Sequence, residues 1–127
     1  MPENGKTAGL ARIRVKRAHE EPAPGDGFRI LVDRLWPRGL TKKRLKINLW
    51  NKDIAPSHEL RRWFGHDPEK WREFKKKYFI ELEANPTAVE TILLCLQRES
   101  AVTFVFGSKE EKLNNAVALQ TYFESLQ

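Results

Sequence analysis

The chain contains a single cysteine, Cys95, among its 127 residues. One cysteine excludes a disulfide within the chain and a zinc site built from several thiolates. A chain so poor in cysteine is typical of a reducing compartment, which predicts a cytoplasmic location. The three histidines, His19, His58 and His66, lie far apart and lack the spacing of a ligand pair on one helix, so we expect no metal site.

Long apolar runs are also missing, since none approaches the roughly 18 residues that a membrane-spanning helix requires. We therefore expect no membrane partner. Residues 1–11 lack the apolar stretch of a secretory signal, and we interpret them as a flexible tail before a single domain at 12–127. No phosphate-loop or kinase motif is present, and Gly25-Asp26-Gly27 precedes an expected strand, the wrong order for a dinucleotide turn. The sequence thus implies no cofactor.

Charge is what the chain has in abundance, and it is unevenly placed. The formal net charge is +6, with 15 basic and 7 acidic residues in 1–64 but 8 basic and 10 acidic residues in 65–127. The stretch 34–52 holds seven basic residues and no acidic one. Such a stretch attracts phosphorylated metabolites, nucleic acid or an acidic partner, and a solvated lysine-rich face is the alternative.

Three short segments have the composition of buried strands, and they lie at 13–16, 28–32 and 102–106. Apolar residues at helical spacing occur through most of the sequence between the segments 28–32 and 102–106, and again after 102–106. Strands separated by helices require crossover connections. The prediction is a helix-rich α/β domain, with a small, mostly parallel sheet and helices packed on it in a two-layer or Rossmann-like three-layer sandwich.

Capping signals indicate where the helices begin and end. Ser57 and Gly65 are typical of the two ends of one helix, and Asp67-Pro68 is typical of the start of the next. Ser108 followed by Glu111 resembles a capping box, which predicts that the last helix begins at Ser108. The aromatic residues that we assign to the core along these helices are Trp63, Trp71 and Phe74.

Polar residues collect after two of the expected strands. Ligands of open parallel sheets bind beyond the carboxyl ends of the strands. If the segments 28–32 and 102–106 are parallel, the residues after them share one edge of the sheet. These residues are Asp33, Arg34, Trp36 and Arg38 after the first strand, and Ser108 and Lys109 after the second. A carboxylate beside several cations suits a polar or anionic ligand, whereas an Asp33 that pairs with Arg34 or caps loop amides is the alternative.

Further candidates lie outside these two loops. Asn114 and Asn115 are poor residues for a helix interior, so their presence in the last helix favours a use in binding. Arg61 and Ser57 join the site if their helix borders the cleft. Ser108 is more typical of a helix cap than of a nucleophile, because no paired base is visible.

Two blocks of sequence are specific enough to indicate a family. They are Val32-Asp33-Arg34-Leu35-Trp36-Pro37-Arg38-Gly39 and Ala55-Pro56-Ser57 followed by Leu60-Arg61-Arg62-Trp63-Phe64. With Asn114-Asn115-Ala116-Val117, the chain resembles the domain of unknown function 488 family, in its YeaO-like branch, from about residue 13 to 123. Other branches carry Cys-x-Glu and Cys-His-Arg where this chain has Phe106-Gly107-Ser108 and Asn114-Asn115-Ala116. The thiol and imidazole of those motifs are groups that serve as a nucleophile and a base, and this chain lacks them at the matching positions. The resemblance therefore implies a binding site without a catalytic nucleophile and base.

Three functions are compatible with these patterns. The favoured one is a protein that binds, or binds and transforms, an anionic or phosphate-bearing small molecule between the loop 33–39 and the strand end 107–109. In this hypothesis Arg34 and Arg38 hold the anion, and Asp33 orients Arg38 and is the only candidate acid or base. The second is a nucleic-acid-binding module that uses the basic stretch 34–52 with its two tryptophans. The third is an interaction protein, with an acidic partner or as a homodimer.

Overall fold

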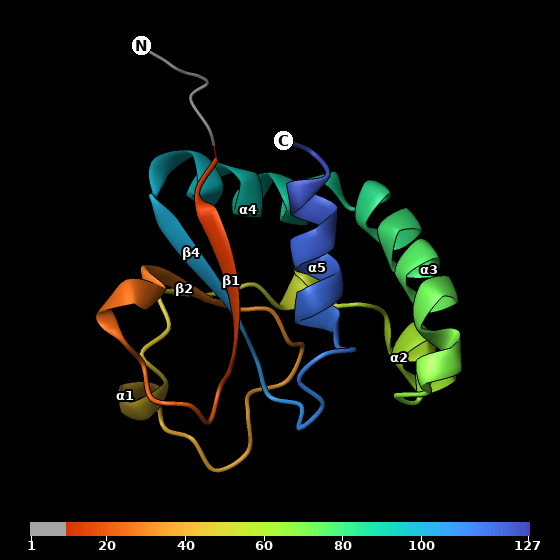
Figure 1. Ribbon diagram of the computed structural model, residues 1–127, viewed down its shortest axis with the longest axis horizontal. Coiled ribbons are helices and arrows are strands. Elements are labelled where there is room, and N and C mark those ends of the chain that lie inside the picture. Colours follow the sequence, from red (N-terminus) through yellow and green to blue (C-terminus); the bar gives the residue numbers. More distant parts are fainter. Residues whose placement is uncertain (1–9) are drawn as a thin grey trace.

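A computed structural model describes residues 10–127 as a four-stranded sheet with five helices. The strands are β1 (Arg12–Arg17), β2 (Phe28–Leu31), β3 (Leu49–Trp50) and β4 (Ala101–Phe106), and they lie in the order β1-β4-β2-β3 (Figure 1). All three strand pairs are parallel, as the sequence predicted. Of the tail expected at 1–11, residues 1–9 lie outside the part of the chain that the structure describes. Ala11 is buried, and its amide donates to the Leu96 carbonyl at 2.8 Å.

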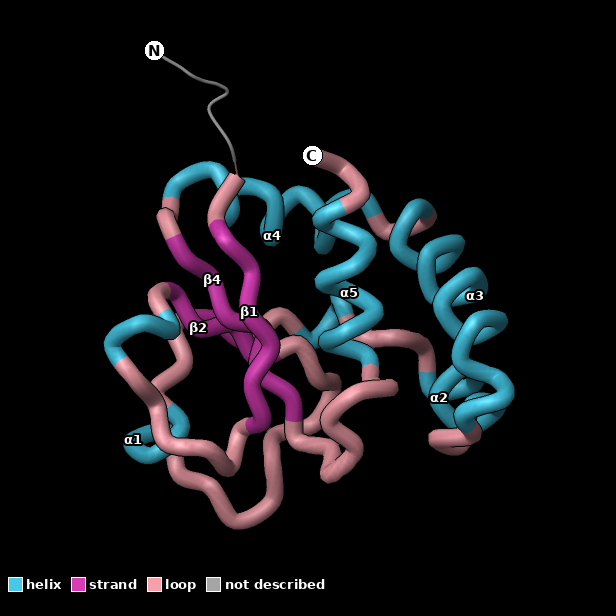
Figure 2. Tube along the Cα trace, in the orientation of Figure 1, coloured by secondary structure: helices cyan, strands magenta, loops and turns pink. Residues whose placement is uncertain are grey.

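Helices account for 47% of the structure and strands for 15%, which confirms the helix-rich α/β fold. They are α1 (Lys42–Leu45), α2 (His58–Phe64), α3 (Trp71–Glu83), α4 (Pro86–Arg98) and α5 (Asn115–Glu124). Loops that follow the strands gather at the opposite end of the sheet from α4 (Figure 2). No helix in the described part of the chain has the length and apolarity to cross a membrane.

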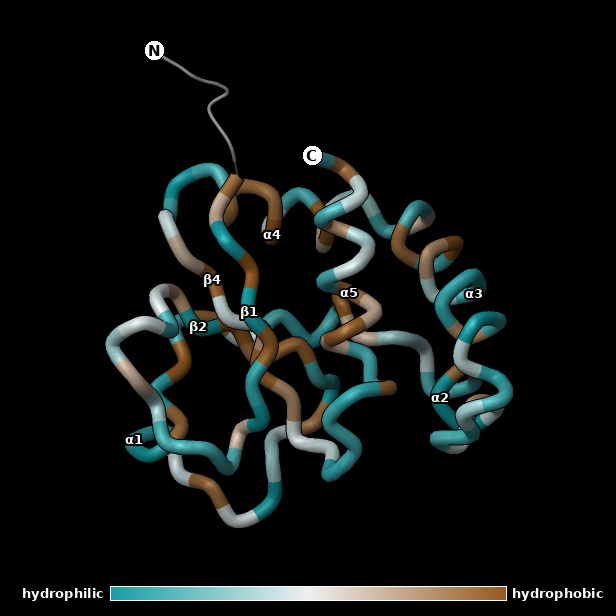
Figure 3. The backbone as a smooth tube through the Cα atoms, in the orientation of Figure 1, coloured by the Kyte–Doolittle hydropathy of each residue, from teal (hydrophilic) through white to brown (hydrophobic). Residues whose placement is uncertain are grey.

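Strand side chains alternate between two apolar clusters. Ile30 and Phe104 belong to the main core, together with residues of α2 to α5, whereas Leu31 and Val105 belong to a smaller core on the opposite face. This alternation follows from the period of two along a strand, and it explains why the central strands carry apolar residues on both faces. The smaller core includes Leu45 of α1, a helix whose exposed residues are hydrophilic (Figure 3).

One charged side chain interrupts the apolar run of β2. Arg29 is 4% exposed, and its Nη1 atom lies 2.7 Å from Asp26 Oδ2. Its Nε and Nη2 atoms donate to the Leu45 carbonyl oxygen at the end of α1, at 3.2 and 2.8 Å. Each nitrogen of the buried guanidinium of Arg29 thus has a hydrogen-bond acceptor, and the side chain ties α1 to the sheet.

Two sequence-based expectations are wrong. The last helix begins at Asn115, with Asn114 as its N-cap, and not at Ser108. Ser108 Oγ does accept from the Glu110 amide at 3.0 Å, but this contact closes a turn in an irregular segment instead of a helix. Trp63, assigned to the core, is 37% exposed, and its ring is covered by Lys70 and Lys77.

Candidate functional site

The carboxyl ends of β2 and β4 lie together, because the two strands are parallel and Leu31 pairs with Val105. Asp33, just beyond β2, therefore meets Gly107, just beyond β4. The Gly107 amide donates to Asp33 Oδ2 at 2.8 Å, and Asn115 Nδ2 of α5 donates to Asp33 Oδ1 at 3.1 Å. The Asp33 carboxylate thus joins two strand ends and the first residue of α5.

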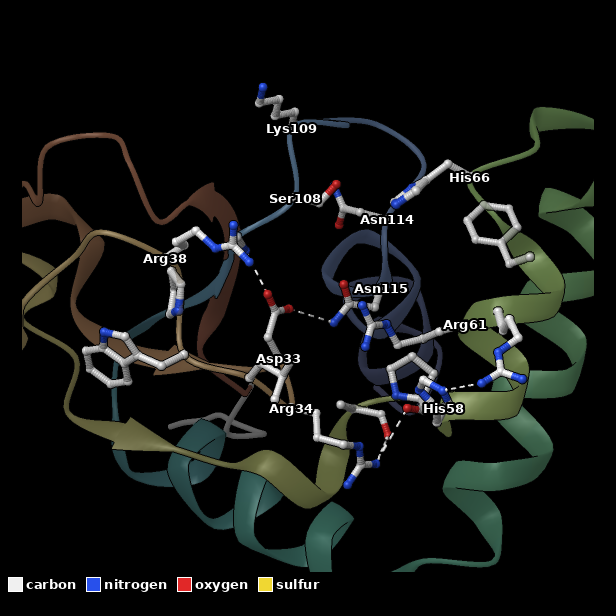
Figure 4. A pocket seen from close by; sticks show the side chains of 18 of the residues that line it. Asp33, Arg34, Arg38, His58, Arg61, His66, Ser108, Lys109, Asn114 and Asn115 are labelled. Atoms are coloured by element: carbon white, nitrogen blue, oxygen red, sulfur yellow. Dashed lines mark hydrogen bonds between the residues drawn. The ribbon is translucent and has the colours of Figure 1, made fainter.

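A cavity of about 610 Å³ opens at this edge of the sheet (Figure 4). Most of the residues singled out from the sequence line it, namely Asp33, Arg34, Trp36, Arg38, Arg61, Ser108, Lys109, Asn114 and Asn115. Ser57 does not line it. The Ser57 hydroxyl donates to Glu81 Oε2 at 2.5 Å and accepts from the Leu60 amide at 3.1 Å, so it serves as the cap of α2.

The cavity is strongly cationic. Its lining has one carboxylate, that of Asp33, and five cationic side chains, those of Arg34, Arg38, Arg61, Arg62 and Lys109. Within residues 10–127, the ion pairs closer than 4 Å are those of Asp26 with Lys16 and with Arg29, which lie elsewhere. None of the five cavity cations therefore has a carboxylate partner in the described chain.

Burial raises the pKa of the Asp33 carboxyl above its ordinary value. The hydrogen bonds from Gly107 and Asn115 and the positive charge of Arg61 act in the opposite direction, because they favour the ionised form. The expectation that Asp33 orients Arg38 finds no counterpart among these contacts. The carboxylate is held by the backbone of Gly107 and the amide of Asn115 instead.

The two arginines of the loop after β2 differ in their surroundings. Arg34 is half-buried, and its Nη2 atom donates to the Ala55 carbonyl at 3.2 Å, which ties the loop to the segment before α2. Arg38 is exposed and has no side-chain hydrogen bond within the described residues. Arg34 is thus fixed in place by neutral acceptors that leave its charge uncompensated, whereas Arg38 is free to contact a ligand.

Both asparagines that the sequence singled out have structural partners. Asn114 is 2% exposed, and its Oδ1 accepts from the Val117 amide while its Nδ2 donates to the Glu110 carbonyl. Asn115 Nδ2 donates to the Val32 carbonyl as well as to Asp33. Asn114 is therefore a cap at the cavity wall, and Asn115 holds Asp33 in position.

Three further polar residues line the cavity, His58, Arg62 and His66, and sequence reasoning missed the first two. Arg62 Nη2 and His58 Nε2 lie 2.8 Å apart on α2. The signal was available, because residues 58, 61 and 62 are spaced to share one face of a helix. His66 follows the glycine that ends α2 and has a positive φ of 57°, which no sequence pattern indicated.

Groups suited to covalent chemistry are not paired in this cavity. Cys95 is 3% exposed within the main core, away from the cavity lining. Ser108 lines the cavity, but its hydroxyl accepts from the Glu110 amide and has no histidine or carboxylate partner among the described residues. The described chain also contains no group of three or more His, Cys, Asp or Glu residues placed to hold a metal ion.

The two tryptophans of the basic stretch 34–52 pack partly against the smaller core. Trp36 and Trp50 are half-buried against the smaller core, with their ring centroids 5.3 Å apart. Each indole N–H donates to a backbone carbonyl, Trp36 to Leu40 and Trp50 to Asp33. The lysines of α1 are exposed, and Lys52 Nζ lies 4.4 Å from the centroid of the Trp50 ring, so a nucleic-acid-binding role for this stretch stays a prediction.

Comparison with known proteins gives one family and several relatives. A family model described as the inactive DUF488-N3 subclade matches residues 12–126. An uncharacterized protein of Mycobacterium bovis is 41% identical over 108 residues, which cover 85% of this chain and 90% of that protein. The uncharacterized protein YeaO of Escherichia coli is 34% identical over 114 residues, which cover 90% of this chain and 98% of that protein. No solved structure matches.

Proposed function

The chain belongs to the inactive DUF488-N3 subclade, and from this premise we propose that it binds an anionic, phosphate-bearing small molecule in the cavity without catalysing a reaction on it. Family membership confirms the resemblance that the sequence blocks indicated. The relatives are uncharacterized proteins, so the support comes from the cavity itself, and membership of an inactive subclade agrees with binding without catalysis.

One observation carries the proposal. Five cationic side chains line one concave site and have no carboxylate partner within the described residues. Like charges gathered around one cavity repel one another, and a bound anion relieves that repulsion. The four arginines among them present planar, forked donors that match the oxygens of a phosphate group.

The rest of the lining favours an organic anion over a bare inorganic ion. Apolar surface comes from Phe64, Phe74, Pro37 and Pro56, and Trp36 adds an indole. Small-molecule sites are commonly apolar clefts of roughly 300–1,000 Å³ with a few well-placed polar groups. A cavity of about 610 Å³ lies within that range, which is large enough for a phosphorylated metabolite.

Binding without catalysis accounts for the side chains that are present. A nucleophile needs a base within hydrogen-bond reach, and the described lining contains no such pair. Asp33, the one carboxylate, is held by Gly107 and Asn115, which leaves it a fixed acceptor in the wall of the site.

Isothermal titration of the protein with fructose 6-phosphate and with neutral fructose tests the proposal. The phosphate ester is expected to bind and the neutral sugar is not. Arg38→Gln is expected to weaken binding of the ester by roughly ten- to a hundredfold, since hydrogen bonds to charged groups contribute about 1.5–3 kcal/mol. Arg44→Gln is the matched control, because this substitution removes the same charge from α1, outside the lining of the cavity.

Two results would overturn the proposal. Equal losses for Arg38→Gln and Arg44→Gln would mean that the ester responds to net charge and not to the cavity. Binding of a single-stranded oligonucleotide that is lost in Arg44→Gln and kept in Arg38→Gln, with no binding of the ester, would instead favour the nucleic-acid function. Such binding would weaken steeply as salt is raised.

A further inference from the structure

The cations of the cavity come from two different sides of it. The strand-end cations, Arg38 and Lys109, follow β2 and β4, and the helix cations, Arg61 and Arg62, belong to α2. Figure 4 shows Arg38 and Arg61 on opposite sides of Asp33, and Lys109 beyond the strand end. The positive charge is therefore divided between two walls and not concentrated at one point.

A carboxylate stands between the two walls. Asp33 lies between Arg38 and Arg61 in Figure 4, fixed by Gly107 and Asn115. A phosphate placed midway would approach this carboxylate, which repels anions. A phosphate on either side would meet cations while lying farther from that carboxylate, so the repulsion is weaker there.

The centre of the cavity suits a different chemical group. Each carboxylate oxygen of Asp33 accepts one hydrogen bond within the protein, and a carboxylate oxygen has capacity for a second. A hydroxyl group of the ligand supplies the donor that such an oxygen accepts. The order across the cavity is thus cation, hydrogen-bond acceptor, cation.

From this arrangement we infer that the ligand is a polyol or sugar with a phosphate at each end, held by the strand-end cations at one phosphate and by the helix cations at the other. The inference rests on the proposed function and narrows its ligand class. A phosphate monoester carries about −1.5 to −2 charges at pH 7, so one such group leaves part of the charge of the five cations uncompensated.

The test compares three anions by isothermal titration. Fructose 1,6-bisphosphate has two phosphates separated by a sugar, fructose 6-phosphate has one, and pyrophosphate has two that are adjacent. Joining two binding groups through a spacer that fits both subsites raises affinity on the order of a hundredfold over one group. The bisphosphate is therefore expected to bind about a hundredfold more tightly than fructose 6-phosphate, and also more tightly than pyrophosphate.

Substitutions locate the two subsites. Arg38→Gln and Arg61→Gln are each expected to reduce the affinity for the bisphosphate toward that of fructose 6-phosphate on the unaltered protein. Arg72→Gln on α3, an exposed arginine outside the lining, is the control that removes the same charge and leaves affinity unchanged. Both cavity arginines are exposed, so these variants are expected to fold, and circular dichroism checks that they do.

Each other outcome has a definite meaning. Pyrophosphate binding as tightly as the bisphosphate would overturn the two-wall arrangement and leave the proposed function standing. If Arg61→Gln still bound the bisphosphate about a hundredfold more tightly than fructose 6-phosphate, the two-wall arrangement would likewise be overturned and the proposed function would stand. If none of the three anions binds, the proposed function itself fails, and this inference fails with it.

Discussion

The side-chain amide of Asn115 donates to the carboxylate of Asp33 across 3.1 Å, linking residues that are 82 positions apart in the sequence. The same Asn115 nitrogen donates to the Val32 carbonyl at 3.2 Å. The first residue of α5 is thereby attached to the end of β2, while Gly107 attaches the end of β4 to the same carboxylate. Asp33 therefore has a structural role as well as a place in the cavity.

Asp33→Asn is expected to destabilise the fold. The two oxygens of Asp33 face two donors, the Gly107 amide and the Asn115 amide. An asparagine in this position must turn its own NH₂ group toward one of them, which leaves a donor unpaired in a partly buried site. We expect the free energy of unfolding to fall by about 1–3 kcal/mol, as measured by urea denaturation. A loss below about 0.5 kcal/mol would show that these hydrogen bonds are not what holds the strand ends together.

The pKa values of Asp26 and Asp33 are shifted in opposite directions, so we expect their contributions to stability to depend on pH with opposite signs. Burial raises the pKa of Asp33 above 3.8. Burial also acts to raise the pKa of Asp26, but hydrogen bonds from Ala23, Lys16 and Arg29 outweigh it and lower that pKa below 3.8. Carboxyl ¹³C titration by NMR should therefore place Asp26 below and Asp33 above the unperturbed value.

The consequences for stability follow from linkage. Stabilisation by Asp26 is present above pH 3.8 and is lost as the pH falls through its lower folded-state pKa. The contribution of Asp33 is fully present below pH 3.8 and is lost as the pH rises through its higher folded-state pKa. Urea denaturation across this range should give a shallower acid loss in Asp26→Asn than in the unaltered protein. An unchanged acid slope in that variant would contradict the role of the Asp26 ion pairs.

Gly27→Ala is expected to be strongly destabilising. Gly27 has a φ of +65°, and an added Cβ would overlap the Ala101 carbonyl oxygen at the start of β4. Strain of the left-handed conformation and overpacking should together cost at least about 2 kcal/mol in urea denaturation. Gly39→Ala is the control, because Gly39 also has a positive φ, of 81°, but nothing lies within 4 Å of its added Cβ. A cost of about 1 kcal/mol is expected there, and equal costs at both positions would contradict the overlap with β4.

Much of the fold was predictable, because its signals are local. The apolar runs of β2 and β4, the Ser57 cap and the Gly65 terminus all appear where the sequence placed them. The shared edge of the sheet followed from the parallel pairing of these strands. The two residues of β3 were missed, since Leu49–Trp50 is too short to show a period.

The site was predictable only in part, because its details depend on contacts distant in sequence. Residues after the two strands were found, since the strand ends determine where they lie. The fixing of Asp33 by Gly107 and Asn115 was not, because nothing near Asp33 in the sequence indicates those donors. Ser57 was a candidate on the condition that its helix borders the cleft. The helix does border it, but the Ser57 hydroxyl donates to Glu81 on α3.

The start of α5 supplies the last prediction, because two residues had competing claims to its cap. Asn114 Oδ1 accepts from the Val117 amide at 3.0 Å, whereas Ser108 Oγ accepts from Glu110 in a loop turn. Asn114→Ala should lower the free energy of unfolding by about 1–2 kcal/mol, through the lost cap and the unpaired Glu110 carbonyl.

Ser108→Ala is the matched comparison, expected to cost less than about 0.5 kcal/mol because the affected turn is partly solvated. Asn114→Ser separates the two contributions, since serine keeps a side-chain oxygen to cap Val117 and has no nitrogen to donate to Glu110. Urea denaturation should place its stability between those of the unaltered protein and Asn114→Ala. If Ser108→Ala lowered the free energy of unfolding more than Asn114→Ala, this prediction would be contradicted. The stability of α5 would then depend on Ser108 more than on the Asn114 cap.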